Sequence, residues 1–476
     1  MFRIARKTLI VFVVALLVGS AVHAQDAGVP GAEGIGDPDF PLLGNGGYDV
    51  QHYTLDLTAD VEANTLDGTV TITAMLTEDL ESFNLDFVET YTITQLTVDG
   101  TPAEWELSGH ELTVTPANTL TAGDTVEIAI TYSGSPEPEP GTAIPVDLGW
   151  NNYGTGSYVA SEPDGAASWY PVNDHPLDKA TYTFRITVPE PFVVAANGVL
   201  TDTIDNGDTT TYVWEMDDPM ASYLATVGID DFVVQTAEGP DGVQIRNFFP
   251  PEVAEEGERL FAPTADMIAF FSETFGPYPF DAYGVYVADV DLPFALETQT
   301  MTLFARSWLD FGSGLEEAVA HELAHQWYGN SVSLSEWGDI WLNEGFATYA
   351  SWLWFEHEGG PEALEETVSQ IYEGLAEYSS SGNLLPPGDP SASDLFSVSV
   401  YYWGAMTLHA LRLQVGDEAF FEILRTYYDR YQHSNATTED FIAVAEEVSR
   451  QDLGAFFDSW LYGDTLPELP SGPVVG

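Results

Sequence analysis

The stretch His-Glu-Leu-Ala-His at residues 321–325 most constrains the fold, because its two histidines act together only on a helix. On a helix, His321 and His325 project from the same face, one turn apart. Two imidazoles so placed can both reach one zinc ion at about 2.0–2.1 Å. Glu322 then lies beside the metal without occupying it, where a general base for a zinc-activated water must be. The stretch therefore predicts a helix that carries two zinc ligands and a catalytic base.

A catalytic zinc site also needs a third protein ligand and a position left open for water. The segment WLNEGFA, residues 341–347, offers Glu344 on the next predicted helix. Eighteen residues separate His325 from Glu344, which is enough chain for a loop and a second helix. In a chain with 76 acidic residues, a glutamate at this spacing alone is weak evidence for a third ligand. The residues around Glu344 make the match specific.

HELAH followed by WLNEGFA, with eighteen residues between His325 and Glu344, resembles the gluzincin zinc metallopeptidases of the aminopeptidase N and leukotriene-hydrolase family. The resemblance covers most of the chain, including its N-terminal half and the segment Trp169–Tyr182. It implies one zinc ion per chain, held by His321, His325 and Glu344.

The resemblance also implies residues that bind a substrate. The family motif Gly-Ala-Met-Glu-Asn corresponds to Phe294–Thr298, so Ala295 and Glu297 are expected to contact the substrate. Glu297 would hold the free α-ammonium, since an anion near the metal positions only the first residue of a peptide across the scissile bond. Three of the five motif positions differ here, and a surface glutamate in an acidic loop is the structural alternative for Glu297.

Two further positions follow from the same resemblance. Glu162, which precedes Pro163, corresponds to a second amine-binding carboxylate, although Ala160 stands where the family has a glutamine. Tyr401, in a Tyr-x-x-Gly pattern, corresponds to the tyrosine that stabilises the oxyanion. Tyr402 competes for that role, and core packing at the start of a helix is the alternative for both tyrosines.

The hydrophobic pattern divides the chain in two. Residues 48–240 alternate in short β-like runs, which predicts an antiparallel β domain. Residues 241–465 are mainly helical in pattern, with one long helix expected over residues 252–275. With the resemblance, the expected fold class is multi-domain α+β, in which a thermolysin-like, mixed α/β and mainly helical catalytic domain follows the β domain. Residues 25–47 are expected to form a flexible leader and residues 466–476 a tail.

The N-terminus has the features of a secretory signal. Arg3, Arg6 and Lys7 precede a run of ten apolar residues, and small residues before Gln25 offer a cleavage site. We therefore expect residues 1–24 to be removed and the protein to be extracellular or periplasmic. The run is short for a spanning helix, which needs about 20 apolar residues, so no membrane span is expected in the mature chain.

The charge of the chain excludes some partners. It carries 76 acidic and 12 basic side chains, a formal charge of −64. Such a surface repels phosphate backbones, so nucleic acid is not an expected partner. Scarce lysine with heavy acidity is typical of salt-adapted surfaces, and a general solubility bias of an exported protein is the alternative.

These features together predict a zinc-dependent aminopeptidase that acts on peptides with a free N-terminus. Two alternatives remain open: an endopeptidase with the same zinc site, suggested by the altered motif at residues 294–298, and a non-catalytic peptide-binding protein with the same fold.

Overall fold

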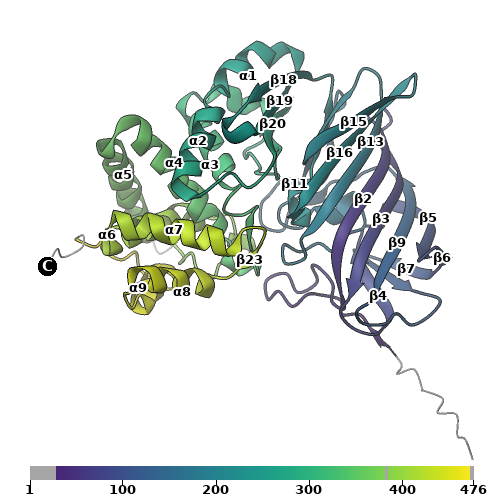
Figure 1. The fold of residues 1–476 in the computed structure, drawn as a ribbon, viewed down its shortest axis with the longest axis horizontal. Helices are drawn as coiled ribbons and strands as arrows, with labels where there is room; N and C mark the ends of the chain where they lie inside the picture. Colours follow the sequence, from purple (N-terminus) through teal and green to yellow (C-terminus); the bar gives the residue numbers. More distant parts are fainter. Residues whose placement is uncertain (1–27, 381–383, 472–476) are drawn as a thin grey trace, which may run out of the picture.

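The structure is a computed structural model that describes residues 28–380 and 384–471. Figure 1 shows a β-rich part, drawn in purple to teal, beside a mainly helical part in teal, green and yellow. This arrangement confirms the predicted fold class. The expected signal, residues 1–24, lies outside the described residues. Among the described residues no helix is long and apolar enough to cross a bilayer.

The largest sheet of the β domain pairs segments that are far apart in the sequence. Its eight strands lie in the order β15 (Val199–Asp205), β16 (Thr209–Met220), β13 (Ala180–Pro189), β2 (Tyr48–Asp60), β3 (Thr65–Leu76), β9 (Thr125–Gly134), β5 (Tyr91–Val98) and β6 (Thr101–Pro102). On β2, Leu55 and Leu57 are buried and Asp56 is exposed, because successive residues of a strand point to opposite faces. This alternation is the pattern that predicted the β domain.

Two smaller sheets complete the β domain. One has the order β1 (Val29–Pro30), β4 (Leu80–Asp86), β8 (Glu111–Thr115) and β7 (Glu104–Ser108). The other has the order β10 (Glu139–Pro140), β11 (Asp147–Asn152), β12 (Ser157–Ala160), β17 (Val227–Asp230) and β14 (Val193–Ala196). The end of β12 leads directly to Glu162, so this sheet places a candidate site residue.

A mixed four-stranded sheet begins the catalytic part. Its order is β18 (Val233–Glu238), β19 (Gln244–Phe249), β20 (Ala282–Ala288) and β21 (Thr302–Ala305). The pair β18 and β19 is antiparallel, whereas β19, β20 and β21 are parallel to one another. The proposed domain boundary at residue 240 therefore falls between two paired strands.

Helices form the rest of the catalytic part. They are α1 (Ala254–Leu260), α2 (Thr264–Phe275), α3 (Ser313–Ala324), α4 (Trp341–Gly359), α5 (Pro361–Ser380), α6 (Gly404–Val415), α7 (Asp417–Tyr431), α8 (Thr438–Ser449) and α9 (Gly454–Leu461), with the short strands β22 (Val332–Leu334) and β23 (Ser434–Ala436) between them. The single helix expected over residues 252–275 was wrong. Pro263 separates α1 from α2, because proline has no N–H to donate to the preceding turn and its ring clashes with that turn.

The described part of the expected leader, residues 28–47, is packed against both halves of the molecule. Asp37 is 3% exposed, and its Oδ2 atom accepts a hydrogen bond of 2.8 Å from the backbone N–H of Trp337. The same oxygen lies 3.1 Å from His175 Nε2. Phe40 packs on the ring of Trp337 with centroids 6.0 Å apart. This segment therefore links the β domain to the helical part.

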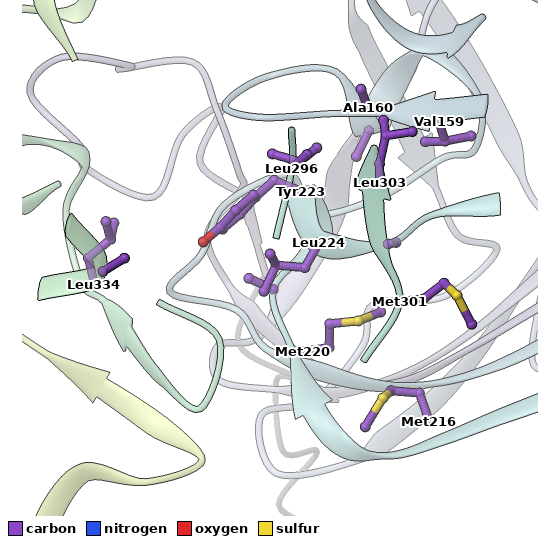
Figure 2. Packing of buried hydrophobic residues seen from close by; sticks show 14 of the residues in the cluster. Val159, Ala160, Met216, Met220, Tyr223, Leu224, Leu296, Met301, Leu303 and Leu334 are labelled. Carbon is purple, nitrogen blue, oxygen red and sulfur yellow. The ribbon is translucent and has the colours of Figure 1, made fainter. Parts of the chain in front are cut away.

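One hydrophobic core spans both halves. Figure 2 shows Met216 and Met220 of β16 close to Met301, which precedes β21. Leu296 and Leu303 exchange backbone hydrogen bonds of 3.0 and 2.9 Å, which hold the segment before β21 against that strand. The shared core fixes the β domain relative to the segment that carries Glu297.

Candidate active site

His321 on α3 and His325 at the C-terminal end of that helix direct their rings toward the same place. The Nε2 atoms of His321 and His325 are 3.0 Å apart. Two ring nitrogens at this distance cannot both direct a proton at the other. The arrangement leaves lone pairs to converge on a shared cation.

Glu344 reaches the same place from the first turn of α4. Its Oε2 atom lies 3.1 Å from His321 Nε2 and 3.5 Å from His325 Nε2. The following residue, Gly345, lets α6 approach closely, because a Cβ atom at residue 345 would lie 2.9 Å from the backbone carbon of Gly404. The glycine after Glu344 thus sets the packing of the helices beneath the site.

The spacing of these three donors fits a tetrahedral zinc ion. Ligands about 2.0–2.1 Å from a tetrahedral centre lie roughly 3.3 Å from one another. The three donor pairs here are 3.0, 3.1 and 3.5 Å apart. Two imidazoles and one carboxylate are also a ligand set typical of catalytic zinc. The residues present therefore fit the metal that the sequence predicted.

Hydrogen bonds and charges prepare the donors for a cation. His325 Nδ1 lies 3.1 Å from the carbonyl oxygen of Tyr328, so donating its proton there leaves Nε2 free to bind a metal. Burial alone would raise the pKa of Glu344, but the facing histidines outweigh it and lower that pKa to about 2. The carboxylate is therefore ionised, as a metal ligand must be.

Glu322 lies beside the donor cluster rather than within it. It is buried, and one of its oxygens lies within 4.8 Å of donor atoms of His325 and Glu297. Burial raises the pKa of Glu322 well above its ordinary value, although the charge of His325 opposes this. A carboxyl group in this position can accept a proton and return it.

Glu162 and Glu297 bring two more carboxylates to the site. Oxygens of Glu162, Glu297 and Glu344 lie within 4.8 Å of one another. The Oε1 atoms of Glu162 and Glu297 are buried and have no hydrogen-bond partner in the described part of the chain. A pair of buried acceptors without donors suits a ligand that supplies several N–H groups and a positive charge. The surface alternative for Glu297 is therefore wrong, since its side chain is buried in the site.

The segment that carries Glu297 is tied to the loop that follows α3. The carbonyl oxygen of Glu297 accepts hydrogen bonds from Gln326 Nε2 at 3.0 Å and from Asn330 Nδ2 at 2.7 Å. Ala295, two residues earlier, lines the same cavity and is partly exposed to it. We did not predict Gln326 and Asn330, because their role depends on where the Glu297 segment crosses the loop.

Tyr401 faces the donors from a π-helical turn, η8 (Ser399–Trp403). Its ring stacks on that of His321 with centroids 5.9 Å apart and an interplanar angle of 14°. Burial and the neighbouring carboxylates raise the pKa of Tyr401, so its hydroxyl keeps its proton and can donate it. Tyr402 lines the same cavity beside it, so neither tyrosine serves only as core packing.

The cavity has a volume of about 440 Å³ and contains every sequence-predicted site residue. Its lining also includes Phe294 and Tyr402, and residues that the sequence did not single out: Pro293, Trp308, Gly314, Glu317, Ala318, Thr348 and Ser351. Another unpredicted neighbour is Tyr223, whose hydroxyl lies 3.4 Å from Asn343 Nδ2. The charges of Glu297 and Glu162 contribute, after burial, to raising its pKa.

Two family models match the chain. The Peptidase M1 N-terminal domain matches residues 49–224, and the Peptidase family M1 domain matches residues 261–460. Curated relatives include aminopeptidase M1 of Arabidopsis thaliana, 28% identical over 63% of this chain and 36% of that protein. Aminopeptidase N of Lactococcus lactis is 27% identical over 64% of this chain and 38% of that protein. The chain thus spans little more than a third of the length of these relatives.

Solved structures match over nearly the whole chain. The crystal structure of an M1 zinc metallopeptidase from Deinococcus radiodurans is 33% identical, with a TM-score of 0.82. It covers 93% of this chain and 99% of its own. A mutant of an M1 zinc metallopeptidase from that organism, solved with a Tyr-Ser-Ala substrate, matches with the same identity and TM-score over 92% of this chain and 99% of its own.

Proposed function

The chain belongs to peptidase family M1, and from this we propose that it is a zinc-dependent aminopeptidase that removes the first residue of peptides. One observation carries the proposal. Three metal-binding atoms, spaced as in a tetrahedral zinc site, lie beside two buried carboxylates. The Oε1 atoms of these carboxylates have no hydrogen-bond partner in the described part of the chain. The first group suits the metal and the second suits a free α-ammonium.

His321, His325 and Glu344 would hold one zinc ion per chain. When bound, this ion supplies a Lewis acid that polarises a carbonyl group and makes a water molecule more acidic. His325 and Glu344 are buried, which strengthens the charge interactions among these side chains.

Glu322 is the proposed general base. Its carboxylate accepts a proton from the attacking water and later delivers that proton to the leaving amine. Its position close to His325 and Glu297 supports this role, because the base must reach both the attacking water and the leaving amine.

Tyr401 is the proposed oxyanion donor. Its hydroxyl, kept protonated by burial and by the surrounding carboxylates, donates a hydrogen bond to the oxygen that becomes negative as water adds to the carbonyl. The stacking of its ring on His321 supports this role, because it places the tyrosine beside a proposed zinc ligand.

Glu297 and Glu162 are proposed to bind the α-ammonium of the substrate, and Ala295 to line the adjacent backbone. An ammonium has three N–H donors, which match the unpartnered oxygens of the two glutamates. Fixing this group positions the first peptide bond at the three donors, so the enzyme acts as an exopeptidase.

A panel of aminoacyl-coumarins tests this function on the purified protein. We expect hydrolysis of substrates with a free amine, loss of activity with a chelator, and recovery on adding zinc. N-acetylated substrates should be cleaved poorly. Equal cleavage of free and blocked substrates would favour the endopeptidase, and no cleavage by zinc-loaded protein would favour a non-catalytic peptide-binding protein.

Export is the proposed fate of the chain. The positive residues and the apolar run at the start of the sequence support cleavage after residue 24. N-terminal sequencing of the protein recovered from outside the cytoplasm should begin at Gln25, whereas an intact N-terminus on a cytoplasmic protein would contradict export.

A further inference from the structure

Glu317 is a lining residue of the cavity that the proposed mechanism does not use. It lies on α3, one turn before His321, and is half-buried. Within residues 28–380 and 384–471 its carboxylate has no hydrogen bond and no ion pair. Burial raises its pKa, and no cation offsets this effect. A ligand with a positive charge would give this carboxylate the partner that the described residues do not supply.

The position of Glu317 identifies which part of a substrate it meets. Glu297 and Glu162 lie near His325 and Glu344, toward the C-terminal end of α3. Glu317 lies toward the opposite end, about 6 Å before His321 along the helix axis at 1.5 Å per residue. Along the axis of α3, the proposed ammonium-binding pair therefore lies toward His325 and Glu317 lies beyond His321.

A peptide that extends from the glutamate pair toward Glu317 must pass the three metal-binding atoms. With its ammonium at the glutamate pair and its first peptide bond at the donors, its second residue lies beyond His321. Each extended residue advances about 3.3–3.6 Å, so the side chain of the second residue can reach a carboxylate one helical turn away. Glu317 thus faces the second residue and not the first.

The walls of the cavity that Glu317 lines suit a long side chain with a charged end. Trp308, Phe294 and Ala318 line the same cavity, and Trp308 Nε1 donates a hydrogen bond of 3.1 Å to the carbonyl oxygen of Phe294. That bond fixes the aromatic wall. The methylene stem of arginine or lysine packs on such a surface, while its head pairs with a carboxylate. Gly314, one turn before Glu317, adds no side chain that would fill the space.

We propose that Glu317 selects peptides whose second residue is arginine or lysine, by pairing with that side chain across the cavity. The proposal rests on the aminopeptidase activity proposed above and names its substrate class. The other glutamates of the cavity already have proposed roles: Glu344 binds the metal, Glu322 transfers the proton, and Glu297 with Glu162 binds the ammonium. Glu317 is therefore the glutamate of the cavity that is available to the second side chain.

Three tripeptides test this selection: Leu-Arg-Gly, Leu-Gln-Gly and Leu-Glu-Gly, with released leucine as the readout. Each kcat/KM is divided by that of the same variant on leucyl-aminomethylcoumarin, which has no second side chain. For the wild type we expect a preference of about tenfold for arginine over glutamine, as for one charge-assisted pair. Glu317→Gln should bring this ratio close to one, and Glu317→Lys should favour the glutamate peptide.

Glu258→Gln is the matched control. Glu258 is exposed on α1, so this substitution removes the same charge outside the cavity. It should keep the wild-type ratio. The proposal is overturned if Glu317→Gln also keeps that ratio, or if the wild type shows no preference for arginine. Failure of the aminopeptidase function would look different, since no leucine would then be released from any of the peptides or from the coumarin substrate.

Discussion

At the scale of single residues, five glutamates share one cavity and differ by what surrounds them. Glu344 faces two histidines, which lower its pKa to about 2 and suit it to a metal. Glu322 lacks such a pairing, and burial raises its pKa well above its ordinary value. One residue type can therefore provide both the proposed ligand and the proposed base, because the neighbours fix the protonation state.

Replacing the base tests this division. Glu322→Gln keeps the size of the side chain but cannot accept a proton, so kcat should fall by about 10²- to 10⁴-fold. Zinc content, measured by elemental analysis, should stay at the wild-type level because Glu322 is not among the three converging donors. A turnover like that of the wild type would remove Glu322 from the role of base.

Removing the proposed ammonium anchor should change selectivity more than stability. In Glu297→Ala the substrate loses a charged partner, so the preference for free over N-acetylated peptides should fall at least about tenfold. The ratio of the two kcat/KM values measures this. If the ratio remains as in the wild type, the ammonium is held elsewhere.

At the scale of elements, the site depends on how closely α4 and α6 approach each other. Gly345 directly follows Glu344, the proposed zinc ligand, and its Cα is 3.1 Å from the Cβ that a side chain at residue 404 would add. The two glycines are thus in mutual contact across the helix pair. Any side chain there would push α4 and displace Glu344 from the histidines.

Gly345→Ala should therefore lower the free energy of unfolding by about 1–3 kcal/mol through overpacking. It should also weaken zinc binding. Gly374→Ala is the matched control, because Gly374 lies on α5 with no atom within 4 Å of its added Cβ. Alanine should stabilise that helix by roughly 0.5–1 kcal/mol. Denaturant unfolding measures both, and equal effects from the two substitutions would contradict the packing argument.

At the scale of the whole molecule, the site joins the two halves of the chain. Glu162 follows β12 of the β domain, whereas the proposed zinc ligands lie on α3, at its end and on α4. Their separation is set by the core that spans both halves and by Asp37, which bonds Trp337 across the junction. The formal charge of −64 acts against this compact arrangement through self-repulsion.

Salt should therefore stabilise the folded protein. Raising KCl from low to molar concentration screens the carboxylates, and we expect Tm to increase steadily. An uncharged solute of equal osmolarity is the control, and it should shift Tm less. A protein with its highest Tm in dilute buffer would refute a salt-adapted surface.

Sequence reasoning succeeded where spacing along one helix determines the geometry. His321 and His325 converge because residues four apart share a face, and that holds wherever the helix lies. Glu317 shares the same face but was overlooked, since nothing local shows that it lines a cavity. The interactions of Glu297 with Gln326 and Asn330 depend on a loop crossing that periodicity does not encode.

The element boundaries show the same limit. The predicted helix over residues 252–275 had a continuous apolar pattern, yet Pro263 divides it, because a missing N–H outweighs the pattern. The short helix α9 was not predicted, since eight residues are too few for a clear helical period. The position of α9 and the position of Asp37, in the expected leader, both depend on tertiary packing.

The most direct test of the account is the zinc content of the purified protein, measured by inductively coupled plasma mass spectrometry alongside Glu344→Ala. We predict one zinc per chain in the wild type and a large loss in the variant, with hydrolysis of leucyl-aminomethylcoumarin falling in parallel. Full zinc occupancy in Glu344→Ala, or a wild type that is active without any metal, would contradict the assigned centre.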